Sequence, residues 1–259
     1  MDLTGRSAIV TGGAGGLGGA TVRLLADRGM QVAVLDRDRD RAAALAADLG
    51  VPGDQLVAIG GDVTVDEDVT AVVDAACSAG VLSVVVNVAG GGVGGGPTVR
   101  TDGTVHDMKS FRRTMTMNAI GTFNVTRLAA AAMSANEPDD DGQRGVIVNT
   151  ASIAAYEGQR GQVAYAAAKA AIVGMTLPMA RDLAPAGIRV CSIAPGPMGT
   201  PVMLAVRHQL DEDPAADVVF PPRMGEPEEF ARLVETIVDN PYLNGESIRL
   251  DGALRLGGS

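Results

Sequence analysis

The sequence predicts a single α/β domain whose mainly parallel, seven-stranded sheet is covered by helices on both faces. Seven short apolar runs alternate with longer segments of helical apolar periodicity, and this alternation is typical of strand-helix-strand units. A glycine-rich turn follows the first apolar run, as in a doubly wound fold that binds a ligand at its strand ends. No linker or internal repeat divides residues 1–259, so the chain is expected to fold as one domain.

The predicted elements follow one another in a regular order. The strands are expected at residues 7–10, 31–35, 56–59, 83–86, 146–150, 188–193 and 247–250. The helices are expected from the glycine-rich turn to about residue 28, at 38–49, 66–79 and 107–135, around Tyr165, and at 228–239. Ligands of a parallel sheet collect at the carboxyl ends of its strands. The candidate residues that share this position are Thr11, Asp36, Asp62, Asn87, Ser152 and Pro195.

The first unit is predicted to bind a dinucleotide. Its glycine-rich turn, residues 11–18, stands between a strand and a helix, and the next strand ends at Asp36. Glycines let the backbone approach a pyrophosphate, and the helix N-terminus offers it unpaired N–H groups. Two glycine registers fit the turn. They are Gly13, Gly15 and Gly18, or Gly12, Gly16 and Gly18.

Asp36 also indicates which dinucleotide is used. A carboxylate there would bind the adenosine ribose hydroxyls and repel the 2′-phosphate of NADP, so NAD is favoured. Arg37 could bind that phosphate instead. However, the alternation of Arg37 to Arg41 with Asp38 and Asp40 is more typical of a solvated helix start.

The middle of the chain contributes loops and one long helix. Residues 90–106 are glycine-rich and are expected to form a surface loop, with a substrate-contacting flap as the alternative. Asn118 falls inside the predicted 107–135 helix, where asparagine is mildly unfavourable. Its side chain is therefore expected to bond a backbone group or a water near the site, although an ordinary polar helix position is the alternative.

Tyr165 and Lys169 are the strongest catalytic candidates. Residues four apart on a helix lie on the same face, so an ammonium would stand beside a phenol and lower its pKa. The phenol could then act as a general base for an alcohol or a general acid for a ketone. The chain has 3 Tyr and only two Lys, and chance gives this spacing with a probability of about 0.02. Ser152 precedes the helix and could bond the same substrate oxygen.

The remaining polar clusters do not predict a metal site. Residues 197–222 follow no long regular pattern and suit a substrate loop over the site. His106 and His208 lie in loop-like regions without a ligand partner at a recognisable spacing. Cys77 and Cys191 fall in apolar patterns and are expected to be buried, reduced thiols.

Charge and hydropathy narrow the range of partners. The net charge of -10 and the pI of about 4.6 argue against a nucleic-acid or anionic-membrane surface. No run of 18 apolar residues occurs, and the first predicted strand begins within a few residues of Met1. A soluble, cytoplasmic protein that acts on a small-molecule substrate is expected.

Taken together, the motifs resemble those of the short-chain dehydrogenase/reductase family, in the same order and spacing. The matching residues are Thr11-Gly12-x-x-x-Gly16-x-Gly18, Asp62, Asn87-x-Ala89-Gly90, Asn118, Ser152, Tyr165-x-x-x-Lys169 and Pro195-Gly196. Val88 departs from the pattern, because many members have a second Asn there. Longer stretches resemble the subfamily of type II 3-hydroxyacyl-CoA dehydrogenases, also called type-10 17β-hydroxysteroid dehydrogenases. They are NEPDDDGQRGVIVNTASIAAYEGQ, GMTLPMARDLAPAGIRV, IAPGPMGTP and NPYLNGESIRLDGA.

The resemblance implies a Rossmann fold and a role for each matched residue. Tyr165 would exchange a proton with the substrate oxygen, and Ser152 would hold and polarise that oxygen. Lys169 would lower the tyrosine pKa and bind the nicotinamide ribose, and Asn118 would position a water. Hydride would pass directly between substrate and nicotinamide, so no metal is required. The implied NAD-binding residues are Gly12, Gly15, Gly16, Leu17, Gly18, Asp36, Asp62, Val63, Asn87, Val88, Ala89, Gly90, Tyr165, Lys169, Pro195, Gly196, Met198 and Thr200.

The resemblance also implies a substrate and an assembly. The expected reaction is the NAD-dependent interconversion of a 3-hydroxyacyl-CoA and a 3-oxoacyl-CoA, in a homotetramer formed through the helices that begin near Asp107 and Gln162. A hydroxysteroid dehydrogenase would use the same catalytic residues. A 3-oxoacyl carrier-protein reductase would prefer NADPH, which Asp36 disfavours. A non-catalytic scaffold is disfavoured by the intact catalytic residues and by the acidity of the chain.

Overall fold

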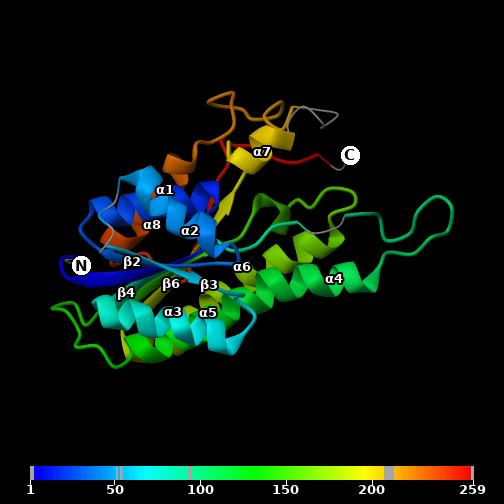
Figure 1. The fold of residues 1–259 in the computed structure, drawn as a ribbon. Coiled ribbons are helices and arrows are strands. Elements are labelled where there is room, and N and C mark those ends of the chain that lie inside the picture. The colour runs from blue at the N-terminus through cyan, green and yellow to red at the C-terminus, as the bar shows by residue number, and fades with distance from the viewer. Residues whose placement is uncertain (1–2, 51, 53–54, 93–94, 207–212, 258–259) are drawn as a thin grey trace.

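The computed structural model describes residues 3–50, 52, 55–92, 95–206 and 213–257, and it has the predicted architecture (Figure 1). One sheet of seven strands runs through the molecule in the order β3-β2-β1-β4-β5-β6-β7, and every neighbouring pair is parallel. The strands are β1 (Arg6–Thr11), β2 (Gln31–Asp36), β3 (Leu56–Gly60), β4 (Val81–Asn87), β5 (Gly145–Thr150), β6 (Ile188–Pro195) and β7 (Ser247–Leu250). The prediction of a doubly wound, seven-stranded sheet is confirmed.

Helices connect the strands and cover both faces of the sheet. The α-helices are α1 (Gly16–Asp27), α2 (Arg39–Leu49), α3 (Asp66–Ala79), α4 (Met108–Met115), α5 (Gly121–Met133), α6 (Val163–Leu183), α7 (Pro201–Val206) and α8 (Pro227–Asp239). Short 3₁₀ turns occur at Ile153–Ala155 and Ala184–Ala186. A π-helical turn, Thr116–Ile120, joins α4 to α5.

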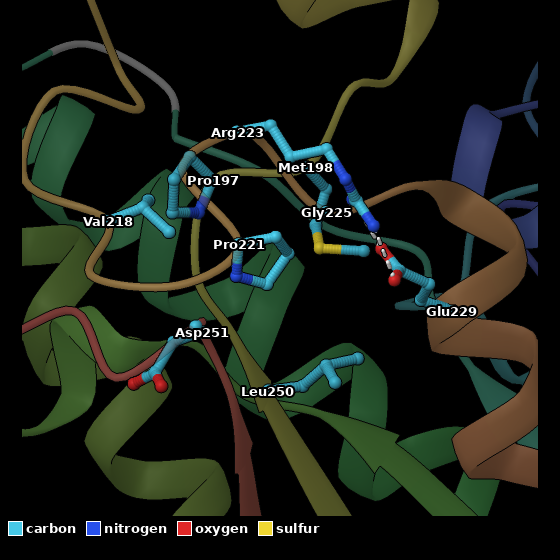
Figure 2. A pocket seen from close by; sticks show the side chains of 10 residues that line it. Pro197, Met198, Val218, Pro221, Arg223, Gly225, Glu229, Leu250 and Asp251 are labelled. Atoms are coloured by element: carbon cyan, nitrogen blue, oxygen red, sulfur yellow. Dashed lines mark hydrogen bonds and ion pairs between the residues drawn. The ribbon is translucent and has the colours of Figure 1, made fainter.

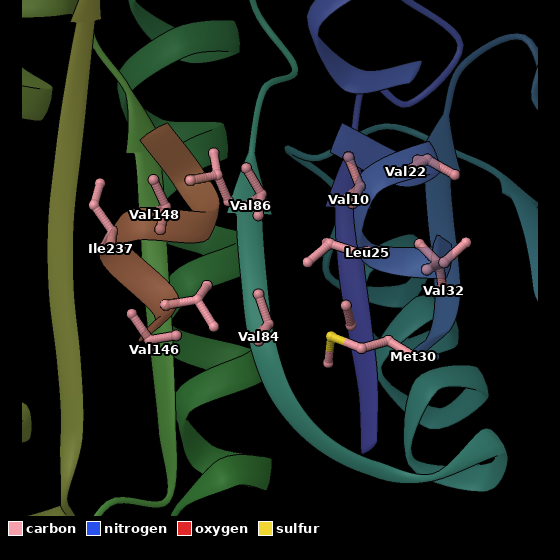
Figure 3. Close-up of a cluster of buried hydrophobic side chains, with 14 of the residues drawn as sticks. Val10, Val22, Leu25, Met30, Val32, Val84, Val86, Val146, Val148 and Ile237 are labelled. Atoms are coloured by element: carbon pink, nitrogen blue, oxygen red, sulfur yellow. The ribbon is translucent and has the colours of Figure 1, made fainter. Parts of the chain in front are cut away.

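Apolar side chains on the two faces of the sheet hold the helices. On one face a single cluster includes Val10 of β1, Leu25 of α1 and Ile237 of α8 (Figure 3). On the other face Ile9 belongs to a cluster with Val125 of α5. Successive side chains of a strand point to opposite faces, so β1 contributes to both clusters. Each fully buried side chain of this size stabilises the fold by about 1.5–3 kcal/mol.

The strand order positions the site. The chain adds β2 and β3 on one side of β1 and the remaining strands on the other, so the direction of sheet growth reverses between β1 and β4. Thr11 is in register with both Leu35 and Asn87, and Asn87 is in register with Asn149. The polar strand ends therefore lie side by side at one edge of the sheet, where open α/β sheets bind their ligands.

Three local predictions need correction. The helix predicted at 107–135 is interrupted by the π-helical turn, and α7 lies in the 197–222 region that was expected to be irregular. Cys191 is buried as predicted, but Cys77 is exposed. The buried face of α3 includes Val73 and Ala76, and Cys77 lies beyond the edge of that face.

Candidate active site

The glycine-rich turn forms one wall of a cavity of about 390 Å³ at the carboxyl ends of the strands. Gly12 has a φ of +67°, which L side chains rarely adopt, and a Cβ there would lie 2.9 Å from the Ala89 Cα. A Cβ at Gly18 would overlap the Gly12 carbonyl. Gly13 instead packs against Val34, where a Cβ would lie 2.5 Å from Cγ1. Of the two possible registers, Gly12, Gly16 and Gly18 is thus the one whose three members all line the cavity.

This turn fits the pyrophosphate of a dinucleotide. Gly15 stands at the N-terminus of α1 without a side-chain cap, and the first turn of α1 carries no acidic residue. The backbone N–H groups at this end are therefore left for an anionic ligand, and the helix dipole favours negative charge there. A Cβ at Gly16 would lie 2.9 Å from Thr200 Cβ and Pro201 Cδ, so glycine is needed there for the turn to pack against the start of α7.

Asp36 lines the cavity together with two arginines. Its Oδ2 accepts a hydrogen bond from the Ala14 N–H at 3.0 Å, and its Oδ1 accepts one from Asp38 N–H at 3.1 Å. Arg41 Nη2 donates to the Ala14 carbonyl at 2.9 Å, and both Arg37 and Arg41 line the cavity. Both arginines are exposed, as expected for a solvated helix start. Arg37, the alternative phosphate-binding residue, does line the cavity, and Arg41 lines it without having been predicted to do so.

The ends of β3 and β4 complete the cavity. Asp62 is fixed by its own turn, because its Oδ1 accepts from the Thr64 N–H at 2.9 Å and from the Thr64 hydroxyl at 2.8 Å. The Thr11 hydroxyl accepts from the N–H groups of Val88 and Ala89, both at 3.1 Å, and so ties β1 to the loop after β4. The predicted residues that line the cavity are Gly12, Gly15, Gly16, Leu17, Gly18, Asp36, Asp62, Val63, Val88, Ala89, Gly90 and Thr200.

Some predicted cofactor residues lie outside this lining. Asn87 is the last residue of β4 and is buried. Its Nδ2 donates to the Asn149 Oδ1 of β5 at 2.9 Å, so its side chain links the ends of the two strands. Pro195 ends β6, and the N–H of Gly196 donates to the Leu250 carbonyl at 2.9 Å. Met198 lines a neighbouring pocket of about 110 Å³ (Figure 2).

The cavity has lining residues that the sequence analysis missed. They are Ala14, Leu35, Arg41, Gly61 and Met117. Ala14, Leu35 and Gly61 could have been inferred, since they belong to the turn and strand ends already singled out. Val202 also lines the cavity and lies in the predicted substrate loop, residues 197–222. Met117 had no such signal, because it comes from the π-helical turn, which the sequence pattern did not predict.

Ser152, Tyr165 and Lys169 are brought together beside the cavity. Ser152 precedes the 3₁₀ turn Ile153–Ala155, and its Oγ accepts from the Ala154 N–H at 3.1 Å. Lys169 is buried, with Nζ 5.7 Å from the centre of the Tyr165 ring. Its Nζ donates to the Thr150 carbonyl at 2.7 Å, so the ammonium is held in place by the end of β5.

Burial controls the ionisation of both helix residues. It raises the pKa of Tyr165, although hydrogen bonding with Ser152 opposes that rise. Burial lowers the pKa of Lys169 to about 8. The expectation that Lys169 brings the pKa of the phenol below its usual value is therefore wrong for this structure. The loss of water around the buried phenol outweighs the hydrogen bond with Ser152, which acts in the opposite direction.

Asn118 is fully buried in the π-helical turn and is engaged with the backbone. Its Oδ1 accepts from the Gly91 N–H at 3.0 Å, and its Nδ2 donates to the carbonyls of Gly91 and Thr114 at 3.0 and 2.9 Å. A Cβ at Gly90 would lie 2.5 Å from that Oδ1 and 3.5 Å from the Lys169 Nζ. The expected backbone bond is confirmed, and Asn118 lies within the same site.

Within the part of the chain that the structure describes, no group of three or more His, Cys, Asp or Glu side chains could hold a metal ion. His106 Nδ1 lies 3.2 Å from the Gly96 carbonyl oxygen and stabilises the base of the 95–106 loop. His208 lies outside the described residues.

Comparison with known proteins adds family information. A model of the family described as "short chain dehydrogenase" matches residues 6–211. The chain is 49% identical over 256 residues to the 3-hydroxyacyl-CoA dehydrogenase type-2 of Homo sapiens, covering 98% of this chain and 97% of that protein. It is 48% identical over 249 residues to the protein of that name from Drosophila melanogaster, covering 96% of each. The crystal structure of 3-hydroxyacyl-CoA dehydrogenase type-2 from Mycobacterium avium superposes with a TM-score of 0.92 at 45% identity, covering 98% of both chains.

Proposed function

The chain belongs to the short-chain dehydrogenase family, and on that premise we propose that it interconverts 3-hydroxyacyl-CoA and 3-oxoacyl-CoA esters with NAD. As a member of this family it is an oxidoreductase that uses a nicotinamide cofactor. The observation that carries the choice of substrate is the similarity to 3-hydroxyacyl-CoA dehydrogenases, which extends over nearly the whole of both chains at 45–49% identity.

The preference for NAD rests on Asp36. Its carboxylate lines the cavity and is held by two backbone N–H groups, in a position to accept hydrogen bonds from ribose hydroxyls. A 2′-phosphate would bring negative charge to the same carboxylate. Arg37 and Arg41 reduce that repulsion but do not remove it, because both guanidinium groups are exposed and their charges are screened by solvent.

The cofactor, when bound, supplies or accepts the hydride at its nicotinamide C4. The protein's own residues handle the substrate oxygen. Ser152 presents a hydroxyl that the 3₁₀ turn orients, and Tyr165 presents a phenol whose raised pKa keeps it protonated at neutral pH. A protonated phenol is suited to donate to the oxygen of a ketone as it becomes an alcohol.

The reverse reaction requires Tyr165 to accept a proton, and Lys169 assists this step. With a pKa of about 8 the ammonium is mostly charged at pH 7. Its Nζ stands 5.7 Å from the ring centre in a water-poor environment, where charges interact more strongly than in bulk water. The side chain of Asn118 holds the loop around Gly91 beside this pair, and its role in positioning a water remains a prediction.

The substrate loop and the oligomer belong to the same proposal. We assign the substrate-loop role to residues 197–222, of which 207–212 lie outside the described residues.

A homotetramer is supported by exposed apolar side chains on the helices expected to form its interface, including Ile120, Phe123 and Leu177. Residues Val163–Ala186 are apolar enough, with a mean hydropathy of 1.4, to cross a membrane by length and composition. Since α6 packs against β6 and the Ser152 turn, contact with a second copy accounts better for its uncovered apolar face.

The test is the initial rate of NADH oxidation with acetoacetyl-CoA, measured beside NADPH and repeated with Asp36→Asn. Turnover confined to NADH, with some NADPH activity gained in Asp36→Asn, is the expected result. A wild-type preference for NADPH would contradict the argument from Asp36. The absence of turnover with either cofactor would reject the acyl-CoA substrate and leave a hydroxysteroid or another secondary alcohol.

A further inference from the structure

The segment that follows β7, residues 251–256, lies between the turn that carries Ser152 and the described part of the substrate loop. Ile153, Val218 and Leu254 are buried together in one small apolar cluster. The N–H groups of Val219 and Phe220 donate to the Gly252 carbonyl at 3.1 and 3.2 Å. The pocket drawn in Figure 2 also has both segments in its lining, with Val218 from one and Asp251 from the other.

A carboxylate at the end of the Ser152 turn fastens this segment. Glu157 accepts two hydrogen bonds from Arg249, Nη1 to Oε1 at 2.8 Å and Nη2 to Oε2 at 3.2 Å, and a third from the Leu256 N–H at 2.9 Å. Arg249 also donates to the Leu254 carbonyl at 2.8 Å and to Asp251 at 2.7 Å. One ion pair thus links the turn, the end of β7 and the segment beyond it.

The ion pair between Arg249 and Glu157 is less exposed to solvent than the ion pair between Arg28 and Glu235 of α8. The side chains of Arg249 and Glu157 are each 21% exposed, against 35% and 33% for Arg28 and Glu235. The hydrogen bonds from Arg249 lower the pKa of Glu157, so its carboxylate is ionised at neutral pH. A paired geometry of this kind fixes orientation as well as distance.

The same turn orients the Ser152 hydroxyl. Ser152 Oγ accepts from the Ala154 N–H, while the N–H groups of Tyr156 and Glu157 donate to the Ile153 carbonyl at 2.9 and 3.1 Å. Glu157 is therefore hydrogen-bonded into the turn through its backbone and to the 251–256 segment through its side chain. Because the turn is short, we expect a displacement at Glu157 to change the direction of the Ser152 hydroxyl.

We propose that Glu157 is a positioning residue for the reaction: through Arg249 and the Leu256 N–H it fixes the 251–256 segment, and thereby orients Ser152 and holds residues 213–222 in place. The proposal rests on the proposed function in one respect, namely that Ser152 binds the substrate oxygen. Glu157 itself acts only through these neighbours.

The test compares Glu157→Gln with Glu235→Gln, which makes the same change in the more exposed ion pair between α8 and Arg28. In Glu157→Gln, kcat/KM for acetoacetyl-CoA reduction falls about tenfold or more, as expected when reacting groups are misplaced by a fraction of an ångström. The NADH Kd stays within about twofold of wild type, since the glycine-rich turn is untouched. Glu235→Gln leaves kcat/KM unchanged.

Arg249→Met should lower kcat/KM by a similar factor. The double variant Glu157→Gln/Arg249→Met should lower kcat/KM no further than either single variant, because all three variants break the same ion pair. Hydrogen exchange gives a second readout that needs no substrate. It should increase in peptides covering residues 152–157 and 213–222 of Glu157→Gln, and not in those of Glu235→Gln.

Several outcomes would overturn the proposal. They are equal kcat/KM in Glu157→Gln and Glu235→Gln, unchanged exchange at 152–157, or a loss of NADH affinity as large as the loss of turnover. If Glu157→Gln proves unstable, Glu157→Asp is measured instead, and wild-type kcat/KM in that variant would reject a requirement for this geometry. If wild type does not reduce acetoacetyl-CoA, the proposed substrate fails, whereas the exchange experiment still decides the role of Glu157.

Discussion

Lys169 shows how strongly the environment of one residue can differ from what its sequence neighbours indicate. Its spacing from Tyr165 is a local property of a helix, so the sequence alone placed the ammonium on the same face as the phenol. Its burial is a tertiary property, created by packing of α6 against the end of β5 and the π-helical turn. The pairing was therefore predictable, and the direction in which the pKa of Tyr165 moves was not.

Burial of Lys169 should make the stability of the protein depend on pH. The pKa is about 8 in the folded chain and 10.5 in the unfolded chain, so folding disfavours the charged form. Below pH 8 both states carry the proton, and the full free-energy cost of burying the charge opposes folding. Between pH 8 and 10.5 the unfolded chain binds more protons than the folded chain, so the free energy of unfolding rises with pH and the cost disappears. Relative to Lys169→Met, wild type should therefore gain about 3 kcal/mol of unfolding free energy over this interval.

Urea unfolding of both proteins at several pH values between 7 and 10.5 measures this difference, and titration of other groups cancels in the comparison. A constant difference across the interval would mean that Lys169 titrates normally in the folded chain.

Tyr165→Phe should remove the proton donor while preserving the shape of the site. We expect kcat to fall by about 10²- to 10⁴-fold, the usual contribution of a general acid. The NADH Kd, measured by cofactor fluorescence, should change little because the ring remains. Tyr242→Phe makes the same change at a side chain that is 97% exposed and should be without effect. Equal activity in Tyr165→Phe and wild type would reject the assigned acid.

At the scale of elements, the glycine-rich turn was predictable because it is encoded within eight consecutive residues. The choice between its two registers was not, because it depends on Val34 of β2 and on Ala89 in the loop after β4. The π-helical turn could not be predicted from the sequence either. It widens the helix locally at Asn118, whose amide satisfies the backbone of Gly91, a residue 27 positions earlier in the chain.

Two neighbouring alanine substitutions test the geometry of the turn. A Cβ at Gly18 would overlap the Gly12 carbonyl, whereas a Cβ at Gly19 would meet the flexible end of Leu45 at 3.3 Å. Gly18→Ala should raise the NADH Kd at least tenfold, a loss of about 1.4 kcal/mol of binding free energy. Gly19→Ala should bind NADH almost normally, since alanine is also the better helix former. Similar affinities in the two variants would show that the turn can shift without loss of the site.

At the scale of the whole molecule, the alternation of strands and helices was sufficient to predict the sheet. Each strand and helix carries its own periodicity, and parallel strands require crossover helices, so local patterns determine the layers. The conformations of residues 197–222 and of the segment after β7 could not be predicted in the same way. Their positions depend on long-range contacts such as those of Glu157 with Arg249 and Leu256.

The exposed apolar side chains of α5 and the π-helical turn predict the response of the oligomer to added charge. Phe123→Glu should break the proposed tetramer, because a carboxylate buried at an interface without a partner is costly. Light scattering after size exclusion should then report a smaller assembly, down to the 26.3 kDa single chain. Val57→Glu adds the same charge at an exposed position of the edge strand β3, outside the expected interface helices, and should leave the mass unchanged. An unchanged mass in Phe123→Glu would move the interface elsewhere.

The pairing of β1 with β4 also has a consequence for biosynthesis. Val81 follows Thr11 by 70 residues, so the first strand leaves the ribosome long before its neighbour on the cofactor side exists. At translation rates of about 5–20 residues per second this interval lasts roughly 4–14 s. During that time only β1, β2 and β3 can pair with one another, and the edge of β1 that later pairs with β4 has no neighbour. The cleft that binds the cofactor is thus assembled late, at the seam where early and later portions of the nascent chain meet.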